Sequence, residues 1–379
     1  MLFSDIIGQE ATKQQLLQSV QQNRLSHAII LLGPEGSGGL PLALAFSQYI
    51  TCENKQAHDA CGVCASCIKA GKYIHPDIHF SYPVVPRKPG DKPISTDYVA
   101  EWRQFIDVHP YGNAYDWLQF IGAENKQGNI TAMECNDIIH KLALKSFESE
   151  YKVLVMWMPE YLGNEGNRLL KLIEEPPANT LFILVAENQE AILATILSRV
   201  HLIKVNPLTK ADMVNALVTR AKAPEQKAQQ IATIASGNYR EALHLLQHAE
   251  DDYYELLRNW LNFIFTGNRV GLQGWVEHIA SPKMGRENQK QFLRYFINLL
   301  EHSLRLQYMD KSQLAFSDEE KDFAGKIQKL ANLEQLEQIA TELDNASYHI
   351  ERNANAKILF HALSIRLQHI FRKKPLPVL

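Results

Sequence analysis

Four of the five cysteines lie within sixteen residues of one another: Cys52, Cys61, Cys64 and Cys67. Thiolates at this spacing can all reach one tetrahedral ion, and Zn²⁺ favours four such ligands in a structural site. In a reducing compartment this crowding indicates a metal site rather than disulfide bonds. An iron–sulfur cluster and unliganded thiols are the alternatives, although the Cys and Pro that would end a ferredoxin-type run are missing. We expect a structural zinc knuckle over residues 52–67.

A glycine-rich segment, Gly33-Pro34-Glu35-Gly36-Ser37-Gly38-Gly39, follows a short apolar run. A strand, a glycine loop and a helix N-terminus together form a cradle whose backbone N–H groups bind phosphate. Gly33 and Gly38 keep the spacing of the ATPase loop, but Gly39 replaces its Lys and Leu40 its Ser or Thr. That Lys contacts the β- and γ-phosphates, and the hydroxyl coordinates Mg²⁺. We expect a degenerate phosphate loop made by Gly33, Gly36, Gly38 and Gly39; residual phosphate binding and a plain glycine turn stay open.

A second part of an ATPase site is also missing. The segment Lys152–Glu160 predicts a buried strand, and an ATPase would carry acidic residues for Mg²⁺ and water at its end. Trp157 and Met158 occupy those positions. The losses at the loop and at this strand together predict an ATPase scaffold that does not hydrolyse ATP.

One candidate catalytic residue remains, in the dipeptide Ser198-Arg199 before a predicted strand. Arg199 could complete the ATP site of a neighbouring subunit as an arginine finger. It could also cap a helix or pair with a carboxylate. Glu174 and Glu175 precede Pro176-Pro177, so we expect them on the exposed last turn of a helix rather than as a catalytic pair.

The composition is that of an ordinary globular protein. The chain has 379 residues, 46% hydrophobic and 21% charged, with a net charge of −3. These values exclude a disordered or collagen-like protein. The slightly negative net charge also gives no overall positive potential that would attract nucleic acid. No apolar run approaches the roughly 20 residues of a membrane span. The N-terminus lacks the features of a signal peptide, so we expect a cytoplasmic protein without membrane contacts.

Up to residue 206, short β-branched runs alternate with helix-period segments, which predicts a mostly parallel α/β sheet covered on both faces. The runs are Ala28–Leu32, Ile78–Tyr82, Val153–Met158, Leu181–Ala186 and Leu202–Val205. Residues 83–129 are rich in Pro and Gly, and we expect an insertion on the surface with one helix near Thr96–Val108. We expect Cys135 to be a core residue.

After residue 206 the patterns are helical. Residues 207–249 predict a small helical domain with a break at Ser236-Gly237-Asn238. Residues 250–379 predict a helical bundle, because long amphipathic patterns such as Gln291–Gln307 and Leu333–Leu343 recur there.

These motifs together resemble the delta-prime subunits of bacterial DNA polymerase III clamp loaders, a family of AAA+ proteins. Besides the glycine loop and the four cysteines, the resemblance rests on Ile6-Ile7-Gly8-Gln9, Arg24-Leu25-Ser26-His27-Ala28, His75-Pro76-Asp77, Asn167-x-Leu169-Leu170-Lys171-x-x-Glu174-Glu175-Pro176-Pro177, Thr195-x-x-Ser198-Arg199, Ser236-Gly237-Asn238-Tyr239-Arg240-Glu241-Ala242 and Asn353-Ala354-Asn355-Ala356-Lys357. The family's motor subunits share several of these blocks but keep the loop Lys and the acidic residues.

The resemblance implies an AAA+ P-loop-like domain at 1–206 with an inserted zinc knuckle, a helical lid domain at 207–249 and an α-helical collar domain for oligomerisation at 250–379. It implies a non-catalytic member of a five-subunit ring with the tau/gamma motor subunits and the delta subunit. The ring, part of the DNA polymerase III holoenzyme (a DNA-directed DNA polymerase), loads the sliding clamp onto primed DNA. Arg199, next to Ser198, would act in trans on a motor subunit's ATP.

Two other functions stay open: an ATP-hydrolysing motor subunit with a noncanonical loop, and a zinc-knuckle DNA-binding module. Missing ATPase residues oppose the first, and the acidic pI opposes the second. Two local assignments are open as well. Arg240 is either a nucleotide-sensing residue or an ordinary helix-start Arg, and Gln313-Leu314-Ala315-Phe316 is a faint clamp-binding motif or a plain loop. Val200 departs from the family, which usually has Cys there.

Overall fold

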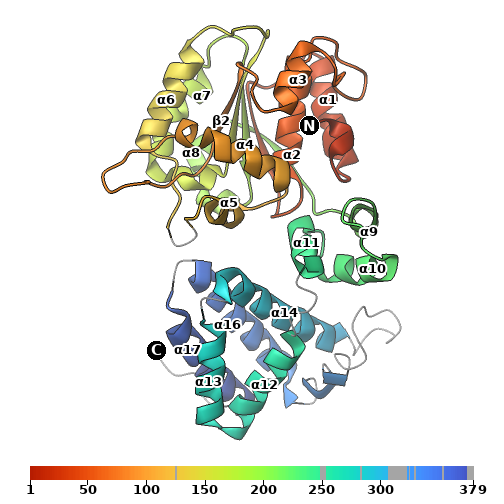
Figure 1. Ribbon diagram of the computed structural model, residues 1–379, viewed down its shortest axis with the longest axis vertical. Coiled ribbons are helices and arrows are strands. Elements are labelled where there is room, and N and C mark those ends of the chain that lie inside the picture. The colour runs from red at the N-terminus through yellow and green to blue at the C-terminus, as the bar shows by residue number, and fades with distance from the viewer. Residues whose placement is uncertain are drawn as a thin grey trace. The chain divides into compact units, whose positions relative to one another are not determined.

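A computed structural model of the chain describes residues 1–123, 126–247, 253–281, 284–305, 322–323, 325–327, 330–351 and 354–373 (Figure 1). The chain divides into two compact units, Met1–Leu246 and Gln247–Leu379. The first holds the sheet with its covering helices, and the second is helical wherever it is described. No helix of the described residues combines the length and the apolar character that a membrane span requires.

Within the described part of the first unit, five parallel strands form one sheet in the order β2-β3-β4-β1-β5. The strands are β1 (Ala28–Leu32), β2 (Ile78–Ser81), β3 (Lys152–Trp157), β4 (Thr180–Ala186) and β5 (His201–Lys204). All five predicted runs are confirmed, with ends that shift by one residue at most. Strands β3 and β4 are buried along their whole length, which explains why both are almost continuously apolar.

Alternate residues of these strands enter two separate cores. One core contains Ile29 and Trp157 and is covered by α1 (Glu10–Gln21), α2 (Gly39–Thr51), α3 (Ala65–Gly71), α4 (Val99–Val108) and α5 (Ala114–Phe120). The other contains Ile30 and Met156 and is covered by α6 (Ala132–Ala143), η3 (Pro159–Leu169), α7 (Leu170–Glu174) and α8 (Ala194–Leu197). The predicted α/β arrangement with both faces covered is therefore confirmed. Cys135 is fully buried in the second core, as expected.

The expectation that residues 83–129 form a surface excursion is wrong for the aromatic part of the segment, although residues 86–92 are exposed. Tyr98, Trp102, Phe105 and Trp117 of this segment are buried in the same core as the sheet. The predicted helix is confirmed as α4, preceded by the short turn η2 (Ser95–Tyr98), but α5 was not predicted. Burying large aromatic side chains outweighs the irregular backbone that Pro and Gly impose, so the segment packs onto the sheet.

Three helices follow the sheet within the first unit: α9 (Lys210–Thr219), α10 (Glu225–Ile234) and α11 (Tyr239–Gln247). They share a small core that includes Met213 and Ile231 and also Ile7 and Tyr111 from earlier in the chain. The predicted break is confirmed, because Ser236 and Gly237 take positive φ values of 47° and 91° between α10 and α11. We call α9–α11 the lid helices.

The second unit has one core within its described residues. Its helices are α12 (Tyr253–Thr266), α13 (Arg269–Ile279), α14 (Gly285–Arg305), α16 (Leu333–Glu351) and α17 (Ala356–Phe371). The indoles of Trp260 and Trp275 stack at its centre with ring centroids 4.8 Å apart. Both predicted amphipathic segments lie on helices, α14 and α16, and the described part of the first ends at Arg305. The motif Gln313–Phe316 lies outside the described residues.

Candidate functional site

The four clustered cysteines lie where α2 ends and α3 begins. Their Sγ atoms are all within 4.8 Å of one another, and those of Cys61 and Cys67 are 3.9 Å apart. Ligand atoms of a tetrahedral Zn–S site with bonds of ~2.3 Å lie about 3.8 Å apart, so the four thiols fit one metal ion. Cys52 directly follows α2, Cys61 and Cys64 lie in the loop after it, and Cys67 lies in α3.

Backbone donors surround the sulfur atoms. The N–H groups of Cys61, Cys64 and Cys67 point at the sulfurs of Cys52, Cys61 and Cys64 over 3.3–3.4 Å. Donors from the backbone of Val63 and Cys64 lower the pKa of Cys61 to about 6. Hydrogen bonds to sulfur stabilise the thiolate, which is the form that binds metal. Burial raises the pKa of Cys52 and of Cys67, so the thiols do not all favour the thiolate by themselves. The geometry is that of a group that could bind one metal ion, as the spacing predicted.

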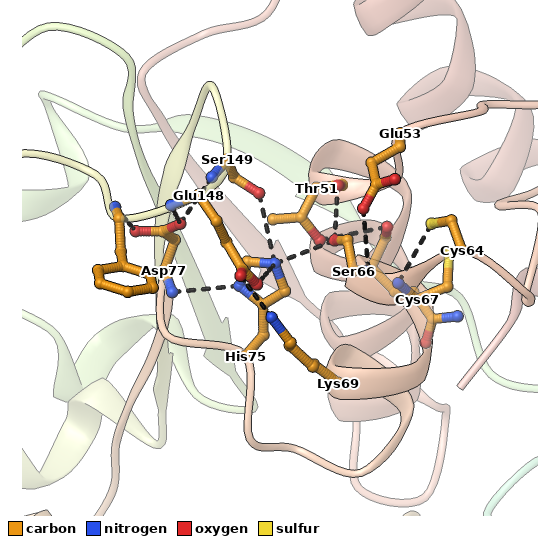
Figure 2. A network of polar contacts seen from close by, with 12 residues as sticks. Thr51, Glu53, Cys64, Ser66, Cys67, Lys69, His75, Asp77, Glu148 and Ser149 are labelled. Carbon is orange, nitrogen blue, oxygen red and sulfur yellow. Dashed lines mark hydrogen bonds and ion pairs between the residues drawn. The ribbon is translucent and has the colours of Figure 1, made fainter.

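A buried polar network ties this knuckle to the sheet (Figure 2). Nε2 of His75 lies 3.0 Å from Oγ of Ser66, next to Cys67, and 3.3 Å from a carboxylate oxygen of Glu148. The Asp77 carboxylate accepts hydrogen bonds from the backbone N–H groups of residues 147, 148 and 149 at 2.5–2.9 Å. Nδ1 of His75 faces the Asp77 N–H instead of an acid, so this is a structural brace and not a catalytic triad.

The glycine segment connects β1 to α2, as a phosphate loop would. Gly36 and Gly38 take positive φ values of 69° and 101°. A small cavity beside it is lined by Gly33, Gly36, Gly38 and Gly39, and also by Trp157 at the end of β3. The structure thus brings together the loop and the strand end that sequence analysis treated as two halves of one site.

An aromatic cluster fills the position where an ATPase carries its acidic residues. The ring centroid of Trp157 lies 5.2 Å from that of Trp102 and 5.8 Å from that of Phe105, both from α4. Trp157 and Met158 are buried. Glu160 is the nearest acid along the chain, but it accepts backbone N–H bonds from Glu187 and Asn188, and burial raises its pKa.

Arg199 lies outside that cavity, at the end of α8 and before β5, an edge strand of the described sheet. Its Nε donates to Glu174 over 2.9 Å and its Nη1 to the carbonyl of Thr195 over 3.0 Å. The side chain keeps 32% of its surface exposed. Ser198 contacts Arg199 Nη1 through Oγ at 3.3 Å. Glu174 ends α7 with its side chain exposed, which confirms that prediction.

Arg240 lies in the first turn of α11, but it is not free to contact a bound nucleotide. Its guanidinium is paired with Asp116 and Glu35. Sequence analysis missed the roles of these two acids and of Tyr111, which lines the small cavity at the loop. The signal that could have found Tyr111 and Asp116 is the density of aromatic residues in the segment 83–129, since such a segment must bury its rings against something.

A family model described as DNA polymerase III, delta subunit, matches residues 8–209. A DNA polymerase III subunit delta' of Escherichia coli K12 is 25% identical over 273 residues, which cover 71% of this chain and 69% of that protein. A DNA polymerase III subunit tau of Bacillus subtilis is 26% identical over 253 residues, covering 65% of this chain. The match spans 37% of that relative's length.

A solved structure of a DNA polymerase III gamma subunit-related protein from Thermotoga maritima is 15% identical to the chain. The alignment covers 96% of this chain and 99% of that one, with a TM-score of 0.42.

Proposed function

Since the chain belongs to the DNA polymerase III delta-subunit family, we propose that it is a non-catalytic subunit of the clamp loader. It works in a five-membered ring in the cytoplasm with the tau/gamma motor subunits and the delta subunit. The ring places the sliding clamp on primed DNA. Residues 1–206 form the AAA+ domain, 207–249 the lid domain and 250–379 the collar that joins the subunits.

One observation carries this proposal. The chain has lost the ATPase residues at Gly39, Leu40, Trp157 and Met158, yet Arg199 remains half-exposed at the edge of the sheet. A residue that serves the chain's own ATP would lie at the glycine loop, whereas Arg199 lies outside its cavity. This placement supports a role for Arg199 at the ATP site of another subunit, where it would stabilise the charge that develops on the transferred phosphoryl group.

The proposal includes one cofactor. The four cysteines hold a structural Zn²⁺, since four soft thiolate ligands leave no position for a reacting water or substrate. The chain itself hydrolyses no ATP, because Gly39 and Leu40 replace the loop Lys and hydroxyl, and Trp157 and Met158 replace the acidic residues at the end of the strand.

The test is the ATPase rate of the tau/gamma and delta subunits with clamp and primed DNA. Three forms of this chain are compared: wild type, Arg199→Ala and Arg168→Ala. Arg168 is the matched control, because it is also exposed and paired with a nearby acid, Glu165. Loss of an arginine finger costs about 10³-fold or more at the site that it serves.

We expect the wild type and Arg168→Ala to stimulate ATP turnover. Arg199→Ala should join the complex without stimulating it. Equal stimulation by all three forms would make Arg199 a structural residue. ATP turnover by the pure chain would instead favour a motor subunit, and salt-sensitive binding of primed DNA by the chain alone would favour a DNA-binding module.

A further inference from the structure

The space above the glycine loop is already filled by the chain itself. The cavity that the four loop glycines line has a volume of about 20 Å³. That is room for about one water molecule, whereas small-molecule sites hold about 300–1,000 Å³. The other lining residues include Pro110, Tyr111 and Gly112 from the turn between α4 and α5. This turn belongs to the segment 83–129, whose role the sequence left open.

Tyr111 makes the deepest contact of this turn. Its hydroxyl accepts a hydrogen bond from the Ile7 N–H at 2.9 Å, and its ring packs edge-on against that of Tyr239 with centroids 5.1 Å apart. The side chain also touches the loop: a Cβ built on Gly38 would lie 3.1 Å from Cε1 of Tyr111. Tyr111 thus joins the N-terminal segment, the glycine loop and the start of α11, and it is 7% exposed.

The carboxylate of Glu35 places a negative charge in the glycine loop itself. Glu35 accepts hydrogen bonds from the side-chain amides of Asn113 at 2.8 Å and Asn238 at 3.0 Å. Arg240 also donates to it, at 3.1 Å. A negative charge held at the loop opposes the approach of a phosphate, which is the reverse of what a phosphate cradle requires.

Arg240 connects the glycine loop to α5 through its guanidinium. Its Nε and Nη2 donate to the two carboxylate oxygens of Asp116 at 2.5 and 2.7 Å, a bidentate pair, while Nη1 donates to Glu35. The residue is 8% exposed, so water screens these pairs little. Arg240 lies on α11, Asp116 on α5 and Glu35 in the loop, and the three elements are therefore bound through one guanidinium.

The retained glycines fit the same arrangement. A Cβ on Gly36 would lie 1.9 Å from Oδ1 of Asn238, and the Tyr239 N–H donates to the Gly36 carbonyl at 3.2 Å. Any side chain at residue 36 would push the start of α11 away. Gly36 is thus required for contact with the lid helices, whether or not the loop binds phosphate.

We propose that residues 109–116 are an intramolecular plug that occupies the nucleotide cleft, and that Arg240 clamps the lid helices onto this plug. In an ATPase, a bound nucleotide would fill the space between loop and lid. Here Tyr111 and the Arg240–Asp116–Glu35 cluster fill it permanently. The lid helices therefore keep one position without ATP. The inference concerns the chain's own cleft and stands independently of the clamp-loader role.

The test is hydrogen exchange of the full chain, followed by mass spectrometry of its peptides. We compare wild type, Asp116→Asn and Arg240→Gln with Arg258→Gln, which removes an exposed arginine paired with Glu255 in the second unit. Each form is measured with and without millimolar MgATP. Tyr111→Phe is a milder variant, because it removes only the hydroxyl that binds the Ile7 N–H.

We expect Asp116→Asn and Arg240→Gln to raise exchange at least tenfold in α11 and in residues 33–39, with β3 and β4 unchanged. Arg258→Gln should leave the first unit unchanged, and MgATP should change nothing in the wild type. Tyr111→Phe should raise exchange near Ile7.

Three results would overturn the proposal. Lid exchange in Arg240→Gln equal to that of the wild type would mean that no clamp exists. An equal rise of exchange in β3 and β4 would mean that the cluster is only a general stabilising contact. Finally, protection of residues 33–39 by MgATP in the wild type would show that the cleft is open.

Discussion

The Arg199 guanidinium donates from Nε to the Glu174 carboxylate over 2.9 Å, and both side chains are partly exposed. Because α7 ends at Glu174, the carboxylate lies at a fixed point beside the end of α8. We infer that Glu174 orients Arg199, the proposed arginine finger. An exposed ion pair of this kind contributes about 0.2–1 kcal/mol.

The change Glu174→Gln should therefore weaken the proposed stimulation of the motor subunits by at most about fivefold, far less than Arg199→Ala. The measurement is ATP turnover of the assembled complex. Glu175→Gln is the matched control, because it removes the neighbouring carboxylate. If the two Gln variants behave alike, the pair does not position the finger.

The thiol cluster predicts the metal content of the purified chain. We expect about one Zn²⁺ per wild-type chain, the same content in Cys135→Ser, and loss of the metal in Cys64→Ser. Cys135 is a control of the same chemistry, since it is buried in a different core. Metal analysis and a visible spectrum measure this directly, and iron with visible colour would contradict the zinc assignment.

The aromatic cluster predicts what happens when the missing acid is restored. Trp157→Asp removes a buried indole and places an unpaired carboxylate among Trp102 and Phe105. We expect a loss of about 3–5 kcal/mol in the free energy of unfolding and no ATPase activity.

Urea unfolding of the two variants Trp157→Asp and Trp157→Phe measures this cost. Trp157→Phe keeps an aromatic ring in the cluster and should cost clearly less. A stable, ATP-hydrolysing Trp157→Asp protein would show that the scaffold retains a usable nucleotide site.

The brace behind the knuckle predicts a pH dependence of stability. Burial alone would raise the pKa of Asp77, but the backbone N–H groups of Phe147, Glu148 and Ser149 together lower it. A carboxyl whose pKa is lower in the folded state stabilises the fold above its unfolded pKa of about 3.9 and loses this contribution as the pH falls. Asp77→Asn should therefore cost about 1–3 kcal/mol at pH 7 and much less near pH 3.

His75 also makes stability depend on pH, but through a group that is neutral in the folded state. Burial lowers its pKa, so the folded state favours the neutral ring, and stability falls as the pH drops below the unfolded value of about 6.5. Urea midpoints from pH 3 to pH 8 should show this loss in both wild type and Asp77→Asn. If Asp77→Asn costs the same at all pH values, the Asp77 carboxylate does not stabilise the fold through its charge.

Much of the architecture could be predicted from local patterns alone. Buried parallel strands are continuously apolar, so the runs at β1, β3 and β4 were recognisable, and cysteine spacing alone indicated a cluster that could bind a metal ion. The absence of a Lys at residue 39 and of an acid at residue 157 was likewise a matter of residue identity.

Only the tertiary structure decided which residues pack over the glycine loop. Nothing in the local sequence links Tyr111 to Ile7 or Asp116 to Arg240, since these pairs are 104 and 124 residues apart. Pro and Gly near residues 83–129 predicted a surface loop, but the burial of Trp102 and Trp117 prevailed over that local preference. The sequence by itself determined that the glycine loop carries no Lys at residue 39 and no Ser or Thr at residue 40. Only long-range packing, which brings residues 109–116 and α11 over the loop, decided that the cleft is closed.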